Sequence, residues 1–271
     1  MEEVKVVSKD LAANVLKDCL VLNNSNLAFN KKRTLSNRSL DLLRKEVCKD
    51  TDPGWKQKRT EFLTAGVASR TLSRRVFGAG GYGSCFQLLR WYIDETFRTK
   101  EQNRLDRNPY CIHGRKYQAE AASLYSNITG FTLSPLGMLT GPLPASKDFE
   151  EVPDFISATF DFVCLEEPII VEVKCPQSFH DDWKRKYWVQ CQHQLQLARF
   201  QKLHLVIYIP RSSHDLARVQ IEEIIVDNKW FRQAVPSYIR FWKLLKDSRE
   251  EHAAEIIRRV KKRKRNYRRQ N

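Results

Sequence analysis

The sequence predicts an α/β protein with a mixed central sheet flanked by helices, and three observations support this. Residues 157–176 contain two short apolar runs, 158–165 and 169–173, separated by a Glu-Glu-Pro turn, a pattern typical of two strands joined by a tight connection. Residues 183–200 carry apolar side chains spaced by three and four, as in an amphipathic helix. The strongly apolar segment 203–209 then predicts another strand.

Composition restricts the classes of protein to consider. The chain has 271 residues and is 42% hydrophobic and 11% aromatic, so it is globular and large enough for one large core or two small ones. With 47 Lys and Arg against 32 Asp and Glu, its formal net charge of +15 indicates a polyanionic partner, most simply nucleic acid. It contains no run of eighteen apolar residues and no apolar region near its N-terminus. We therefore expect no membrane association and an intracellular location.

Seven scattered cysteines without Cys-x2-Cys spacing argue against a zinc finger and predict reduced thiols. The glycine-rich stretch 78–83 lacks both the spacing and the Lys-Ser/Thr of a P-loop, so we expect no nucleotide site there.

Three parts are expected along the chain: an N-terminal helical layer over 1–54, a core over 55–247 and a basic tail over 248–271. Helical spacing of apolar residues between 11 and 19, and again between 40 and 47, supports the first part. The tail has nine Lys and Arg and no acidic residue between Arg258 and Arg269. Three alternatives remain for the tail: a nuclear-localisation run, a disordered DNA-binding arm and a solvated tail. Its basic residues favour a location in the nucleus over the cytoplasm.

Within the core, periodicity predicts helices over 69–76, 86–99, 115–126 and 230–245, and a strand over 221–226. Residues 131–150 read as a turn-rich strand region or loop. In the long helix that begins at Trp183, we expect most of the four glutamines between 190 and 196, and His193, to be solvated.

Three charged side chains interrupt the apolar pattern of residues 157–176, namely Asp161, Glu172 and Lys174. Residues two apart in a strand share a face, so Glu172 and Lys174 point the same way, and a hairpin can bring Asp161 to the same end of the sheet. Two carboxylates beside a lysine suit a hard divalent cation and phosphodiester hydrolysis. The alternative is a surface ion pair, which a lone Glu-x-Lys triplet would more often be. The Ile/Val strand before the pair and the upstream aspartate favour the site.

The Asp-x(n)-Glu-x-Lys pattern on a hairpin is the signature of PD-(D/E)xK nucleases, and the chain resembles one branch of them, the lambda-exonuclease or YqaJ-like viral recombinase family with its relatives the viral alkaline exonucleases. The similarity covers about residues 55–211. Its motifs are Trp55 with Arg59 and Ala68-Ser69, Gly114 to Glu120 leading to Tyr125 and Gly130, the Asp161 hairpin ending in Glu172-Val173-Lys174-Cys175-Pro176, and Gln190-Cys191-Gln192 followed by a strand ending in Pro210-Arg211. The chain departs from the family at Thr159-Phe160-Asp161-Phe162, where Ser-Pro-Asp-Gly is usual.

The resemblance implies a restriction-endonuclease-like core and a set of roles. By position, the metal ligands are Asp161, Glu172 and the backbone carbonyl of Val173, and Lys174 is the residue that positions water. Glu120 corresponds to the helical acid of the site, supported by Gln192 with Gln190. The residues that correspond to 5′-phosphate and DNA contacts are Arg59, Ser69 and Thr159.

The activity implied is a Mg²⁺-dependent 5′-to-3′ exonuclease, with Mn²⁺ able to substitute, acting on linear double-stranded DNA in recombination or in viral or mobile-element DNA processing. The implied partners are duplex DNA with a free end and a single-strand annealing protein, and the resemblance leaves room for a homo-oligomer. Two alternatives stay open: a nuclease of this fold that cuts RNA or cuts internally, and a non-catalytic nucleic-acid-binding module.

Overall fold

The computed structural model describes residues 19–23, 34–72, 85–142, 153–178, 182–212 and 216–270. In the first strand and at the C-terminal end of the last helix only the backbone path is described. The helices are α2 (Asn37–Leu43), α3 (Trp55–Lys58), η1 (Arg59–Glu61), α4 (Ala65–Ala68), η2 (Ser69–Thr71), α6 (Cys85–Ile93), α7 (Glu95–Asp106), α8 (Pro109–Thr129), α9 (Trp183–Ala198) and α10 (Asn228–Gln270).

The strands form two sheets, and the larger is the mixed central sheet that the sequence predicts. The strands are β1 (Cys19–Asn23), β2 (Leu63–Thr64), β3 (Leu133–Pro135), β4 (Met138–Thr140), β5 (Ile156–Thr159), β6 (Phe162–Cys164), β7 (Ile169–Lys174), β8 (Lys202–Ile209) and β9 (Ala217–Ile225). The central sheet has the order β1-β9-β8-β7-β6-β3, and β2-β5-β4 form a small second sheet. The pairs β1–β9 and β7–β8 are parallel, whereas β8–β9, β6–β7 and β3–β6 are antiparallel.

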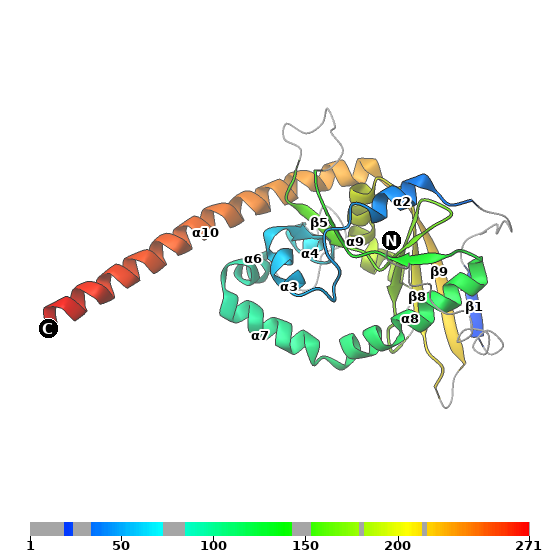
Figure 1. The fold of residues 1–271 in the computed structure, drawn as a ribbon, viewed down its shortest axis with the longest axis horizontal. Helices are drawn as coiled ribbons and strands as arrows, with labels where there is room; N and C mark the ends of the chain where they lie inside the picture. The colour runs from blue at the N-terminus through cyan, green and yellow to red at the C-terminus, as the bar shows by residue number, and fades with distance from the viewer. Residues whose placement is uncertain are drawn as a thin grey trace.

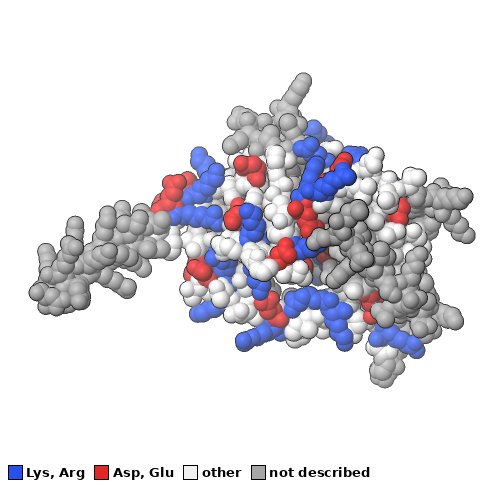
Figure 2. All heavy atoms as spheres, in the orientation of Figure 1, with Lys and Arg blue, Asp and Glu red and all other residues white. Residues whose placement is uncertain are grey.

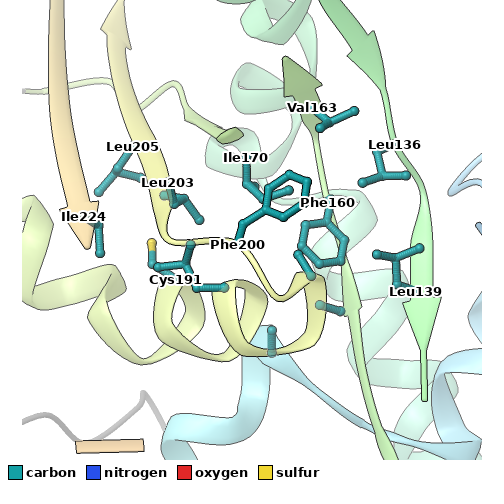
Figure 3. Close-up of a cluster of buried hydrophobic side chains, with 14 of the residues drawn as sticks. Leu136, Leu139, Phe160, Val163, Ile170, Cys191, Phe200, Leu203, Leu205 and Ile224 are labelled. Carbon is teal, nitrogen blue, oxygen red and sulfur yellow. The ribbon is translucent and has the colours of Figure 1, made fainter. Parts of the chain in front are cut away.

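Helices cover both faces of the central sheet (Figure 1). On one face, α9 packs against the sheet, and Figure 3 shows Cys191 of this helix among Leu203, Leu205 and Ile224 from the strands. On the other face, α8 contributes Ala121, Leu124 and Tyr125 to a second apolar cluster. Since both faces of β7 are covered, its five residues from Ile169 to Val173 are all buried, which fits its nearly continuous Ile and Val sequence.

The expected strand over 158–165 is broken into two, and this corrects the prediction of a simple hairpin. β5 ends at Thr159 in the small sheet, and β6 begins at Phe162 in the central sheet. Between them, the backbone N–H of Phe160 donates to the carbonyl of Gly137 at 3.0 Å, and the carbonyl of Asp161 accepts from Leu136 at 3.1 Å. These bonds hold the chain at the crossing between the sheets, and Asp161 lies at this point.

Capping residues explain two further differences. The helix expected over 86–99 is two helices because Asp94 accepts a hydrogen bond from the backbone N–H of Phe97 at 2.9 Å and so begins α7. α8 begins before the expected position, with Asn108 as its N-cap and Pro109 in its first turn, and ends at Gly130, whose φ of 70° suits a glycine.

The N-terminal part and the tail also differ from expectation. Cys19, expected in a helix, begins β1, and the rest of that predicted helix lies outside the described residues. In the described part of the predicted 69–76 helix, only the short turn η2 forms. α10 runs without interruption to Gln270 and projects from the body, so the backbone of the tail is helical, unlike the disordered arm that was one of the alternatives (Figure 1). None of the described helices combines the length and the apolar character that crossing a membrane requires.

Candidate active site

Two carboxylates meet where the small sheet passes into the central one. Asp161 lies at the break between β5 and β6, and its Oδ2 accepts a hydrogen bond from the backbone N–H of Val173 at 2.8 Å. Glu172 directly precedes Val173 on β7, and only 2% of its surface is exposed. Burial, and then the negative charge of Glu172, raise the pKa of Asp161 to about 7 despite the opposing effect of Lys174. Glu172 is therefore shielded from water, and half-buried Asp161 lies near enough to feel its charge.

Lys174, the last residue of β7, supplies the positive charge of this group. Its ammonium pairs with Oε1 of Glu172 and lies 5.1 Å from the ring centre of Tyr187 on α9. Burial alone would lower the pKa of Lys174, but Glu172 and Asp161 outweigh it and hold this pKa above its usual value. Lys174 therefore stays charged at neutral pH.

Two glutamines of α9 hold Glu172 from the other side. Gln190 donates from Nε2 to Oε1 of Glu172 at 2.5 Å, and Gln194 donates to Oε2 at 2.7 Å. Gln194 also lies 3.2 Å from the carbonyl of Thr159 at the end of β5. Residues four apart lie on the same face of a helix, so one face of α9 fixes both oxygens of the carboxylate.

Gln192, the expected supporting glutamine, faces elsewhere, and this corrects the prediction. Its amide donates to the carbonyl of Ile225 at 2.8 Å and accepts from the N–H of Asp227 at 2.7 Å, so it fastens the connection between β9 and α10. All three of Gln192, His193 and Gln194 are fully buried, contrary to the expected solvation. Sequence reasoning missed Gln194, although its spacing of four from Gln190 was a usable signal.

α8 approaches the carboxylates from the opposite face of the sheet. Gln118 makes a side-chain hydrogen bond to Asp161, and half-buried Glu120 accepts one from the hydroxyl of Tyr208 on β8. Cys175 lies within electrostatic reach of Asp161, Lys174 and Glu120. Burial, and to a smaller extent the negative charge of Asp161, raise the pKa of the Cys175 thiol to about 12. The structure thus brings Glu120 to the edge of the group. Gln118 and Tyr208 are contacts that sequence reasoning missed.

The donors at this site suit a hard cation. Asp161 and Glu172 supply carboxylate oxygens, and oxygen atoms of carboxylates and backbone carbonyls are the ligands that Mg²⁺ and Mn²⁺ prefer. A divalent cation would offset both the cost of burial and the repulsion from Glu172, which together raise the pKa of Asp161. Within the described ranges, no three His, Cys, Asp or Glu side chains form a ready-made metal cluster.

The residues expected to contact a phosphate lie on three separate elements, η1, η2 and β5. The Arg59 guanidinium stacks on Trp55 with 4.6 Å between its carbon and the ring centre, and its buried Nε has no hydrogen-bond partner in the described part of the protein. Ser69 is half-buried at the end of α4, which packs against α9 and β5. Thr159 ends β5, two residues before Asp161. Thr159 and Ser69 therefore lie on or beside elements next to the carboxylates, whereas Arg59 lies on η1, which contacts β2 at the far side of β5.

Comparisons with known proteins identify this architecture. No protein-family model matches the chain, and no curated protein matches it in sequence. Among solved structures, it is similar to LHK-Exo, an alkaline exonuclease from Laribacter hongkongensis, with a TM-score of 0.55 and 17% identity over 75% of this chain and 97% of that one. The chain shares the LHK-Exo fold. The complex of LHK-Exo with dAMP gives a TM-score of 0.56 at the same identity and coverage. The predicted fold class and the predicted likeness to alkaline exonucleases are confirmed.

Proposed function

We propose that the protein is a Mg²⁺-dependent deoxyribonuclease that digests linear double-stranded DNA from its 5′ ends. The observation that carries this is the pairing of half-buried Asp161 and buried Glu172 with charged Lys174, located in the fold of an exonuclease. In a surface ion pair, Glu172 would not be buried, nor would it be held by Lys174 and two glutamines. The arrangement therefore favours a catalytic site over a surface ion pair.

The side chains have separate tasks in this proposal. Asp161, Glu172 and the Val173 carbonyl would hold the cation, which when bound activates water and neutralises charge on the phosphate. Lys174 keeps its positive charge beside them and positions the attacking water or the phosphate oxygen. Gln190 and Gln194 orient Glu172, and Tyr208 orients Glu120 at the edge of the site.

The direction of digestion follows from a proposed site for the 5′-phosphate. Arg59, Ser69 and Thr159 would hold that phosphate, since Arg59 has a buried nitrogen without a partner among the described residues and both hydroxyl residues are half-buried. Duplex DNA with a free end is the proposed partner. The net charge of +15 supports binding to a polyanion of this kind.

A cleavage assay tests the proposal. End-labelled linear duplex, closed circular duplex and RNA would be incubated with Mg²⁺, with Mn²⁺ and with a chelator. We expect digestion of the linear duplex alone, only with a cation. Asp161→Asn and Lys174→Met should lose about a hundredfold or more of the rate while retaining the circular dichroism spectrum of the native fold. Exposed Asp41→Asn serves as the matched control and should be fully active.

The remaining outcomes separate the alternatives. Cleavage of circles would favour an endonuclease, and cleavage of RNA a ribonuclease. Binding of DNA without cleavage in either cation, with no difference between the natural protein and Asp161→Asn, would leave only a binding module.

A further inference from the structure

The helix α10 packs on the body before it projects from it. Phe231, Tyr238, Trp242 and Leu245 are buried in one apolar cluster with Tyr92 of α6. Arg249 is half-buried, and Glu250 and Glu251 after it are exposed. This change in exposure places Arg249 at the end of the part of α10 that packs on the body, and Figure 1 shows the helix projecting beyond the body.

At that position, Arg249 contacts the segment that carries Arg59. Its Nη2 donates to the carbonyl of Thr60 at 2.8 Å, and its guanidinium carbon lies 5.8 Å from the ring centre of Tyr92 and 5.9 Å from that of Trp242. The Tyr92 hydroxyl in turn donates to the carbonyl of Phe62 at 2.7 Å. Two long-range hydrogen bonds thus fix the backbone directly after Arg59.

Three arginine side chains lie within electrostatic reach of this tyrosine. Arg59, Arg249 and Arg70 all act electrostatically on the phenol of Tyr92. Among the described residues, none of the three makes an ion pair with an acidic side chain, although Glu101 lies within electrostatic reach of Arg70. Burial lowers the pKa of each of the three arginines. Partly buried positive charges of this kind are costly unless an anion joins them.

A phosphate fits such a cluster. Guanidinium groups present paired donors that match phosphate oxygens, and their charge strengthens each hydrogen bond. Basic side chains elsewhere are spread over the face shown in Figure 2 among acidic ones, so general attraction of DNA does not need these half-buried arginines.

We infer that Arg249 is a positioning residue for recognition of a DNA end: it fixes the Arg59 segment and, with Arg70, adds positive charge at the terminal phosphate. The inference rests on the proposed function, and it makes the C-terminal helix part of the site that distinguishes a phosphorylated end from an unphosphorylated one.

The test compares binding of two short duplexes that differ only in a 5′-phosphate or a 5′-hydroxyl, measured by fluorescence anisotropy in a chelating buffer. The natural protein should bind the phosphorylated duplex more tightly. Arg249→Gln should reduce that preference about tenfold, with the affinity for the hydroxyl duplex nearly unchanged. Arg249→Lys, which keeps a charged donor, should retain part of the preference. Arg240→Gln, exposed on the same helix, is the matched control and should behave as the natural protein does.

Two outcomes would overturn the inference. One is an unchanged preference in Arg249→Gln. The other is an equal loss of affinity for both duplexes together with a lowered melting temperature in both Arg249 variants, which would show a merely structural role. Because binding is measured without a cation, a protein that fails to cleave DNA would contradict the proposed nuclease while leaving this comparison decisive.

Discussion

Gln194 connects three elements of the site. It lies on α9, and its amide donates to Oε2 of Glu172 on β7 and to the carbonyl of Thr159 on β5. We expect Gln194→Leu to lower kcat on linear duplex about 10- to 100-fold with little change in KM, because Glu172 loses a donor that orients it. Steady-state digestion of labelled duplex measures both constants.

Gln192→Leu is the matched control, because this residue is equally buried on the same helix. The substitution should lower the free energy of unfolding by about 1–3 kcal/mol, since the carbonyl of Ile225 and the N–H of Asp227 would then have no partner. The folded fraction should keep its kcat. If Gln192→Leu instead reduced kcat and Gln194→Leu kept it, Gln192 rather than Gln194 would be the glutamine that supports the site.

Residue spacing predicted part of the candidate site and could not predict the rest. Glu172 and Lys174 share a strand face, and the alternation of side chains in strands is enough to place them together. Gln190 and Gln192 are two apart on a helix, where such residues do not share a face, so motif order alone could not tell which one reaches Glu172. Gln118 and Tyr208 had no local signal, because their partners are distant in the sequence.

His193 should make stability depend on pH. Burial lowers its pKa to about 3, whereas an unfolded histidine titrates near about 6.5. Between these values the unfolded chain binds a proton that the folded protein does not, so stability is lost as pH falls from about 6.5 toward 3, at about 1.4 kcal/mol per pH unit from this group. Urea unfolding at several pH values measures the slope.

His193→Leu should flatten this slope above pH 4, since it removes the titrating group and leaves an apolar side chain near Phe231 and Tyr238. An unchanged slope in the variant would assign the pH dependence to other groups.

At the scale of the elements, α10 buries a hydroxyl group that forms no hydrogen bond with the described residues. The hydroxyl of Tyr238 is buried and has no hydrogen-bond partner among the described residues. Tyr238→Phe should therefore keep or raise stability, by up to about 1–3 kcal/mol, because an unsatisfied buried hydroxyl is removed while the ring remains. Thermal and denaturant unfolding measure the change. A marked loss of stability would mean that the hydroxyl has a partner after all.

The broken strand shows why element boundaries resisted prediction. Residues 158–165 are apolar except at Thr159 and Asp161, a pattern that fits one strand as well as two. The break depends on hydrogen bonds to the segment 136–137, more than twenty residues earlier. Capping at Asp94 was local and could have been read from the sequence, because an aspartate before a polar run is a common helix start.

For the whole molecule, the α/β class followed from periodicity, whereas the order of the central sheet did not. The strands β7 and β8 are neighbours in sequence and in space, as a strand–helix–strand unit predicts. The edge position of β1, which pairs with β9 almost two hundred residues later, depends on a pairing that no local pattern encodes.

The distribution of charge leads to the last prediction, at the same scale. The backbone of α10 is helical to Gln270 and leaves the body, and its final part contains five consecutive basic residues, Lys261 to Arg265. Changing all five to Gln in the full chain should weaken binding to linear duplex. It should also make the slope of log K against log[NaCl] less negative, by about 0.9 for each DNA phosphate that the helix no longer neutralises. Dissociation constants measured at several NaCl concentrations, with a chelator present, give the slope. The control changes exposed Lys243 and Lys246 to Gln on the part of α10 that packs on the body. If the five-residue variant and the two-residue control lost the same amount of slope per lysine or arginine changed, the projecting end would act on DNA only through its contribution to the net charge. If the five changes left the slope as it is in the natural protein, the projecting end would not bind DNA.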